Sequence, residues 1–186
     1  DQSALRSAPR EVLYDGLPLP PEPTPSDRLA ARTALGLPAD RVVVVFTGQV
    51  IELKGVADLI RAWALLPAEA RERAELVIVG DDNPTAYRNA IWARQSEKVR
   101  LVGYQYGHVY EQLLVNARMY VSASRLEGTS PSLLSAMSAG VCCLVNGIPE
   151  NRNTTGGSVA LYRQNDADDL VRTWQGLLDD PEQLTR

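Results

Sequence analysis

Short apolar runs alternate along the chain with segments in which apolar residues recur every three or four positions. The clearest run, Val42 to Phe46, is continuously apolar, which is typical of a strand buried on both faces of a parallel sheet. The clearest helical segment begins at about Gly55 and places its apolar side chains on one face. Further strands are expected at 76–79, 99–102, 119–123, 141–145 and 159–162, and further helices at about 86–98, 109–117, 131–139 and after Asp166 or Asp168.

Strands that alternate with helices predict an α/β fold, a doubly wound, Rossmann-like parallel sheet of about six strands with helices on both faces. The first residues differ from this pattern. Five prolines crowd between Pro18 and Pro25, which favours extended backbone with few hydrogen bonds, and only Val12 to Tyr14 resembles a short strand there. We therefore expect residues 1–27 to be an interdomain connector and residues 28–186 to form one domain.

Composition narrows the class of protein. The 186 residues are 45% hydrophobic, and their net charge of −4 with scattered basic residues argues against nucleic-acid binding. No apolar stretch approaches the roughly 18 residues that span a membrane. One histidine, His108, and the lack of a Cys/His cluster argue against a metal site. Cys142 and Cys143 are neighbours on a predicted strand and point to opposite faces, so we expect two buried thiols, compatible with a reducing cytoplasm.

Three loops that follow predicted strands hold the candidate chemistry: 48–54, 80–83 and 127–130. Ligands of such sheets bind outside the carboxyl ends of the strands. Lys54 precedes a helix start, where a cation and backbone N–H groups together suit a phosphate. Glu127 adds an acid at a second helix start. Each feature also has a plainer interpretation: Lys54 as a solvated lysine, Glu127 as a loop acid, Thr129 or Ser130 as a helix cap, and Asp81 and Asp82 as turn formers.

Common nucleotide and hydrolase motifs are missing from the sequence. It contains neither GxGxxG nor GxxxxGK[ST], so the usual dinucleotide and P-loop interpretations lose support. A single histidine and no marked nucleophile leave no convincing catalytic triad.

Taken in order, the loops resemble the carboxyl-terminal domain of a retaining, group 1 glycosyltransferase of the GT-B fold. The resemblance runs from Val12 almost to Arg186, and its order and spacing are more specific than any one motif. The segments that carry it are VLYDG at 12–16, FTGQ at 46–49 with KG at 54–55, LVIVGD at 76–81, VRLVGY at 99–104, LEGTSPSLLSAMSAG at 126–140 and IPEN at 148–151.

The resemblance implies a site for a nucleotide-sugar donor. Lys54 would face the diphosphate and offset its charge as it leaves, and Glu127 would accept a hydrogen bond from a hydroxyl of the transferred sugar. Both would act in catalysis. No metal or other cofactor is expected, because cationic side chains and helix termini take the metal's electrostatic role. The remaining residues implied in binding the nucleotide-sugar are Gly48, Gln49, Gly80, Asp81, Tyr104, Gln105, Gly128, Thr129, Ser130 and Ser135.

Two positions depart from the family pattern. Gln49 stands where the family has an arginine, which removes one charge from the phosphate site. Ser135 stands where the family has a second glutamate that holds the ribose, and serine is too short to reach without a bridging water. Loss of one charge-assisted hydrogen bond would weaken donor affinity about ten- to a hundredfold.

These observations predict the donor-binding half of a glycosyltransferase of bacterial polysaccharide or glycoconjugate synthesis, located in the cytoplasm. The amino-terminal, acceptor-binding domain of the family is missing, so the chain alone is expected to transfer no sugar, and any membrane contact would be peripheral and through the parent protein. Two alternatives stay open: a non-catalytic scaffold or interaction module with a decayed nucleotide site, and a nucleotide-sugar epimerase of the same fold.

Overall fold

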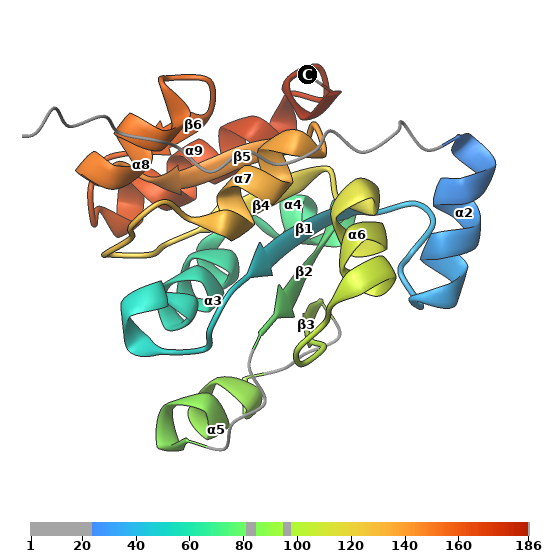
Figure 1. Ribbon diagram of the computed structural model, residues 1–186, viewed down its shortest axis with the longest axis horizontal. Coiled ribbons are helices and arrows are strands. Elements are labelled where there is room, and N and C mark those ends of the chain that lie inside the picture. Colours follow the sequence, from blue (N-terminus) through green and yellow to red (C-terminus); the bar gives the residue numbers. More distant parts are fainter. Residues whose placement is uncertain (1–23, 81–84, 95–97, 186) are drawn as a thin grey trace, which may run out of the picture.

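The computed structural model describes residues 24–80, 85–94 and 98–185 (Figure 1). The strands are β1 (Val42–Thr47), β2 (Ala74–Val79), β3 (Val99–Leu101), β4 (Met119–Ser122), β5 (Cys142–Asn146) and β6 (Ala160–Tyr162). The α-helices are α2 (Pro25–Ala34), α3 (Val56–Leu65), α4 (Ala68–Arg73), α5 (Ala86–Trp92), α6 (Gly107–Asn116), α7 (Pro131–Ser138), α8 (Pro149–Thr155) and α9 (Ala167–Asp179). Two short 3-10 turns complete them: η1 (Glu52–Lys54) and η2 (Gln183–Thr185).

The six strands form one sheet in the order β3-β2-β1-β4-β5-β6, and every neighbouring pair is parallel. The predicted doubly wound α/β fold is thereby confirmed. In such a sheet the chain winds outward in both directions from the middle, and the order reverses between β1 and β4. Ligands of doubly wound sheets bind at that reversal, in the crevice outside the carboxyl ends of the strands.

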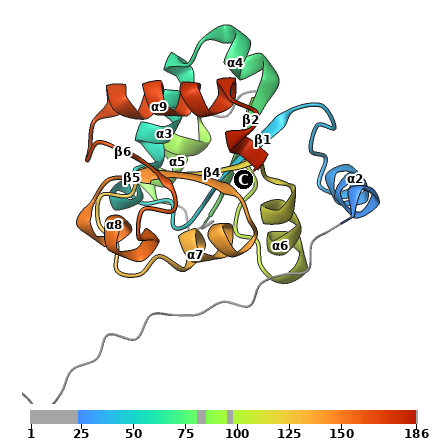
Figure 2. The ribbon, with the colours of Figure 1, turned by 90° about the horizontal axis from the view of Figure 1, so that it is seen from above.

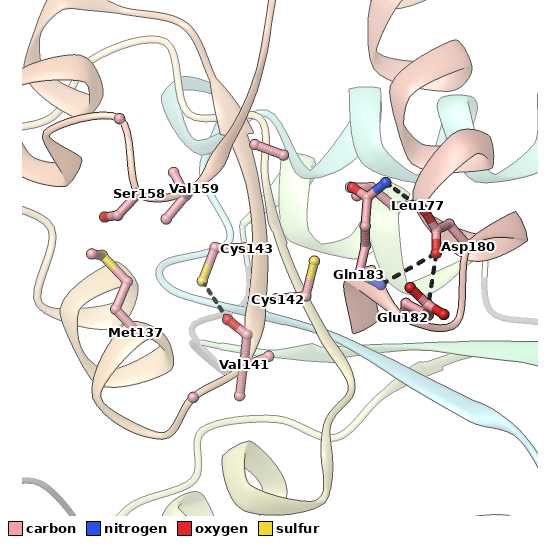
Figure 3. Close-up of a pocket in the computed structure, with 13 residues that line it drawn as sticks. Met137, Val141, Cys142, Cys143, Ser158, Val159, Leu177, Asp180, Glu182 and Gln183 are labelled. Carbon is pink, nitrogen blue, oxygen red and sulfur yellow. Dashed lines mark hydrogen bonds between the residues drawn. The ribbon is translucent and has the colours of Figure 1, made fainter. Parts of the chain in front are cut away.

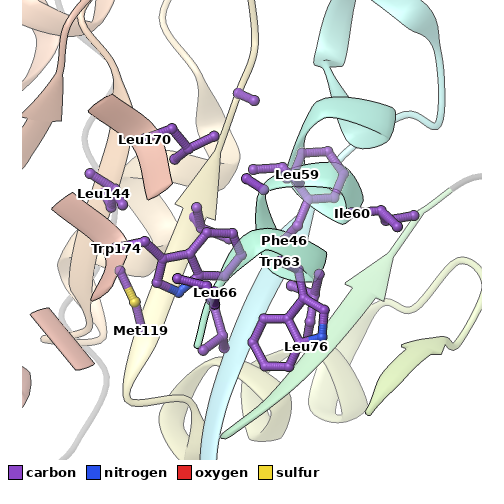
Figure 4. Packing of buried hydrophobic residues seen from close by; sticks show 14 of the residues in the cluster. Phe46, Leu59, Ile60, Trp63, Leu66, Leu76, Met119, Leu144, Leu170 and Trp174 are labelled. Carbon is purple, nitrogen blue, oxygen red and sulfur yellow. The ribbon is translucent and has the colours of Figure 1, made fainter. Parts of the chain in front are cut away.

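Helices cover both faces of the sheet. Figure 2 shows α3, α4 and α9 on one face and α6 and α7 on the other. Alternate residues of β1 divide between two buried clusters, with Val44 and Phe46 toward α3 and Val43 and Val45 toward α6 and α7. Trp63 of α3 meets Trp174 of α9 with ring centroids 5.7 Å apart, joining the two helices over the sheet (Figure 4). Truncating an aromatic side chain buried in this way costs about 3–5 kcal/mol.

The helix α2 corrects the expected boundary of the connector. Its start has a capping box, in which the Thr24 hydroxyl accepts from the Asp27 N–H while the Asp27 carboxylate accepts from the Thr24 N–H. Pro25 fills the first helical position, where its fixed φ is favourable, so it begins a helix instead of extending the connector. Arg28 and Arg32 then donate to the carbonyls of Val115 and Asn116 at the end of α6. The rest of the connector prediction, including the strand at 12–14, lies outside the described residues.

Other predicted elements are found with shifted ends. The helix expected over about 86–98 ends at Trp92, and Asp166 is the residue that caps α9. The sequence interpretation missed α4 and α8. For α8 the signals were present, because Pro149 occupies the first helical position and Gly156 the left-handed position after the last turn.

The two cysteines are free and lie on opposite faces, as expected, but Cys142 is only half-buried. Cys143 is buried in the cluster under α6 and α7, whereas Cys142 packs against the cluster on the α9 side. Among the described residues, none of the helices combines the length and the apolar character that crossing a bilayer requires.

Candidate functional site

Lys54 and Glu127 meet above the reversal of strand order. Lys54 ends the turn η1, which follows β1, and Glu127 lies in the loop between β4 and α7. Because β1 and β4 are neighbours whose crossover connections leave in opposite directions, their following loops border the crevice from both sides. Sequence alone placed both residues on loops after strands, and the structure brings the two side chains together.

The contact is a bidentate ion pair. The Lys54 Nζ lies 2.8 Å from Oε1 and 2.7 Å from Oε2 of Glu127. The Glu127 side chain is only 8% exposed and that of Lys54 is 24% exposed, so the pair is shielded but remains open to a ligand on one side. Charge-assisted hydrogen bonds of this length are the stronger kind. The plainer interpretation of either residue as a solvated surface charge is therefore wrong.

Close backbone contacts hold the two loops against each other. Gly55 adopts a left-handed conformation with φ 67°, and a Cβ there would lie 2.3 Å from the carbonyl oxygen of Ala123. Only glycine meets both conditions. The Arg125 N–H then donates to the Leu53 carbonyl at 2.9 Å, and the buried Ser124 hydroxyl donates to the Leu126 carbonyl at 3.1 Å. The lysine loop and the glutamate loop thus form one packed unit.

The start of α7 presents backbone donors beside the pair. In the described part of the chain, the N–H groups of Gly128, Thr129 and Ser130 have no acceptor within the fold. Ser130 caps the helix, since its hydroxyl accepts from the Leu133 N–H, and Pro131 occupies the first helical position. Ser130 therefore has the capping role that the sequence suggested. Free N–H groups at a helix start favour an anion or a hydroxyl oxygen.

A cavity of about 740 Å³ opens on the α6 and α7 side of the same edge. That size is within the usual range for small-molecule sites. Six of the residues expected to bind the nucleotide-sugar line it, namely Gly48, Gln49, Gly80, Tyr104, Gln105 and Ser135. Lys54, Glu127 and residues 128–130 are not part of its lining, although residues 128–130 lead directly to Pro131 and Ser132 in its wall. Asp81 lies outside the described residues.

Two exposed tyrosines rim this cavity. Tyr104 is 65% exposed and Tyr106 is 76% exposed, and their ring centroids are 6.0 Å apart. Between them the Gln105 amide donates to the Val102 carbonyl at 2.7 Å, which fixes the loop. The sequence interpretation named Tyr104 and Gln105 but missed Tyr106 and Tyr110. The cluster of three tyrosines in seven residues was the signal that could have found them.

Ser135 lines the cavity, but its hydroxyl already has an acceptor. Its Oγ donates to the Pro131 carbonyl one turn earlier, at 2.8 Å. Only the lone pairs of that oxygen remain for a ligand, so Ser135 can accept a hydrogen bond but has no donor free for one. A glutamate at this position would instead carry a full charge further into the cavity.

A different cavity, of about 650 Å³, lies at the opposite edge of the sheet (Figure 3). It borders the amino ends of β5 and β6, away from the carboxyl ends where sheets of this type bind ligands. Burial raises the pKa of the Cys142 and Cys143 thiols there, so both stay protonated and neither is a ready nucleophile. Across the described ranges, no group of three or more His, Cys, Asp or Glu side chains is placed to hold a metal ion.

Known proteins share both the sequence pattern and the fold. Residues 27–186 match the family described as glycosyl transferases group 1. The D-inositol 3-phosphate glycosyltransferase of Stackebrandtia nassauensis is 43% identical over 72 residues, which cover 37% of this chain and 16% of that protein. A protein of the same name from Mycolicibacterium vanbaalenii is 57% identical over 44 residues, covering 24% of this chain and 10% of that protein.

Solved structures agree with the fold. HepE of Anabaena, in complex with UDP-glucose, superposes with a TM-score of 0.75 at 20% identity, over 88% of this chain and 46% of that one. WaaG, a glycosyltransferase involved in lipopolysaccharide biosynthesis, superposes with a TM-score of 0.73 at 20% identity, over 88% of this chain and 45% of that one. The chain therefore spans less than half the length of these relatives.

The parallel sheet is that of the carboxyl-terminal domain of a GT-B glycosyltransferase. The chain belongs to the group 1 family of glycosyl transferases.

Proposed function

We propose that this domain binds the nucleotide-sugar donor of a retaining glycosyltransferase, with the nucleoside in the cavity of about 740 Å³ and the sugar end at the Lys54–Glu127 pair. The pair at the strand reversal carries the proposal. A diphosphate arriving there competes with Glu127 for the Lys54 ammonium. Once Lys54 turns to the phosphate, the Glu127 carboxylate is free to accept from a sugar hydroxyl.

The binding groups would contribute to catalysis through electrostatic stabilisation. Cleavage of the sugar–phosphate bond would leave negative charge on the diphosphate, and Lys54 together with the free N–H groups of 128–130 would stabilise it. No metal ion or other cofactor is needed in this scheme. The Tyr104 and Tyr106 rings offer apolar faces on which a base can stack.

A second domain of the parent protein would bind the acceptor and complete the enzyme. The chain alone would transfer no sugar. HepE, whose structure holds UDP-glucose, is covered over only 46% of its length. The curated relatives are named D-inositol 3-phosphate glycosyltransferases, so a phosphorylated acceptor and a cytoplasmic role in glycoconjugate synthesis belong to the same proposal.

Calorimetry with UDP, GDP and dTDP tests the binding step. We expect weak, saturable heats with at least one of them, and a loss of about tenfold or more in affinity for Lys54→Met, because an ammonium–phosphate contact is removed. Lys98→Met is the matched control, since Lys98 lies at the other end of the sheet, paired with Glu72. No heat at millimolar nucleotide would overturn the proposal.

A gain-of-function variant sharpens the test. Ser135→Glu places a carboxylate on the cavity wall, and we expect nucleotide affinity to rise about ten- to a hundredfold, the value of one charge-assisted hydrogen bond. Ser138→Glu, one turn later on α7 and outside the cavity lining, controls for added charge. Comparison of UDP with its 2′-deoxy form then shows whether the gain comes from the ribose.

A second candidate function is a non-catalytic interaction module. Gln49 is exposed and uncharged, and the Ser135 hydroxyl is engaged within its own helix. This candidate predicts that the nucleotide panel gives no heat and that Ser135→Glu changes nothing. Sugar transfer by the parent protein that Glu127→Ala abolishes would exclude it.

A further inference from the structure

A second hollow, of about 430 Å³, lies at the carboxyl edge of the sheet on the opposite face from the nucleotide cavity. The first turns of α3 and α9 form two of its walls, and the ends of β4 and β6 form its floor. The proposed function assigns nothing to it. Its polar lining consists of Asp58, Arg61, Arg125, Tyr162, Asn165 and Asp166.

Asp58 holds the two arginines of the hollow in place. Its Oδ1 lies 2.9 Å from Nη1 of Arg61, and its Oδ2 lies 2.6 Å from Nη2 of Arg125. Each guanidinium carries five N–H donors, and Asp58 occupies only one terminal nitrogen of each. The arginine side chains are 61% and 47% exposed, so the remaining donors are open to a ligand.

The Tyr162 hydroxyl adds a further donor at the floor of the hollow. The residue is only 3% exposed and lines the hollow, and among the described residues its hydroxyl has no hydrogen-bond partner. Burial raises the pKa of Tyr162, the Asp58 carboxylate raises it further, and the Arg125 guanidinium lowers it in part. The hydroxyl therefore stays protonated, and it can donate to a ligand in the hollow.

The acids of the hollow, in contrast, are already satisfied. Both oxygens of Asp58 are taken by the arginines. Asp166 accepts from the Asp169 N–H at 2.9 Å and pairs with Arg163 at 2.9 Å. Donors are thus in excess, and the group that matches them is one rich in acceptor oxygens and negative charge.

We propose that this hollow binds a phosphate group, held by Arg61, Arg125 and the Tyr162 hydroxyl. Arg125 lies two residues before Glu127 on the same loop, and the hollow shares no lining residue with the nucleotide cavity. This site is independent of nucleotide binding, and either proposal can fail without the other.

Amide NMR of the 186-residue chain, titrated with inorganic phosphate, tests this site. We expect saturable shifts of the Arg125, Asn165 and Ala167 amides at millimolar phosphate. Arg125→Gln and Tyr162→Phe should each weaken that binding about tenfold, because each removes a hydrogen bond to a charged ligand. Arg73→Gln, at an exposed arginine paired with Asp179, is the matched control and should change nothing.

A third variant distinguishes phosphate bound in the hollow from phosphate bound at Lys54. If Lys54→Met abolishes the shifts at Arg125 and Ala167, the phosphate sits in the donor site and this proposal is wrong. It is equally wrong if the shifts are absent, or if both Tyr162→Phe and Arg125→Gln leave the affinity unchanged. Should Arg125→Gln not fold, Tyr162→Phe decides alone, since it removes a single oxygen. Glycerol 3-phosphate should shift the same amides, and glycerol alone should not; equal shifts by glycerol would refute the anion assignment.

Discussion

Breaking the Lys54–Glu127 pair should destabilise the ligand-free domain, and the loss of stability should depend on which of the two residues is replaced. Lys54→Met leaves a carboxylate that is only 8% exposed without its partner. Glu127→Gln leaves a lysine that is 24% exposed and can turn toward water, and glutamine still offers an oxygen. We therefore expect Lys54→Met to be the more damaging change.

The magnitude follows from the burial of the pair. Removing one partner of a fully buried ion pair costs about 3–5 kcal/mol, and an exposed pair contributes less than about 1 kcal/mol. The intermediate exposure of this pair places Lys54→Met at about 2–3 kcal/mol and Glu127→Gln at about 1–2 kcal/mol of lost unfolding free energy. The double variant should lose less than the sum, with a coupling of about 1–2 kcal/mol.

Urea unfolding of the four proteins, followed by circular dichroism, measures this coupling. Lys98→Met combined with Glu72→Gln is the matched control cycle, because Glu72 is 73% exposed although the Lys98 Nζ lies 2.6 Å away. Its coupling should be clearly smaller. A Lys54–Glu127 coupling within about 0.5 kcal/mol of zero, the usual scatter of additivity, would refute the pair as a feature of the protein in solution.

Three further predictions test other features. Gly55→Ala should lower the free energy of unfolding by at least about 2 kcal/mol, because φ is 67° there and the added Cβ would lie 2.3 Å from a carbonyl oxygen. Gly176→Ala, at an open position within a helix, should instead raise it by about 0.5–1 kcal/mol, and thermal unfolding measures both changes. A hydrogen bond from the Arg163 N–H, together with the charges of Arg172 and Arg163, lowers the pKa of Asp169 in the folded protein. The ionised Asp169 therefore stabilises the fold above its ordinary pKa of about 4, and this stabilisation is lost as the pH falls through the lower folded value. The difference in unfolding free energy between the wild type and Asp169→Asn should accordingly disappear in acid. With a thiol reagent at mild alkaline pH, half-buried Cys142 should react faster than Cys143 and both slowly, and fast labelling of Cys143 would contradict its burial.

The sheet was predictable because its signals are local. Continuous apolar runs such as Val42 to Phe46, each followed by a periodic helix, define both the strands and the winding. The short helix α4 escaped because it buries only Ala70 and has no side-chain cap. A helix with so little apolar surface leaves almost no periodic pattern in the sequence.

Site residues were predictable only as members of loops. The sequence located Lys54, Glu127 and Ser135 in loops and a helix start that meet at one edge, but nothing in it stated that the first two would pair, or that the Ser135 hydroxyl would turn back to Pro131. Those contacts depend on how β1 and β4 are set side by side, a long-range consequence of the topology. The hollow lined by Tyr162 was not predicted for the same reason, since its lining comes from three separate stretches of the chain.

The mutual neutralisation of Lys54 and Glu127 also has a kinetic consequence. A free lysine in a crevice would attract an anionic ligand from a distance, but a carboxylate at 2.7 Å cancels most of that field. The chain as a whole carries a charge of −4, which repels a diphosphate. Charge therefore does not accelerate the encounter of a nucleotide with this domain, and screening by salt should leave the association rate unchanged or raise it slightly.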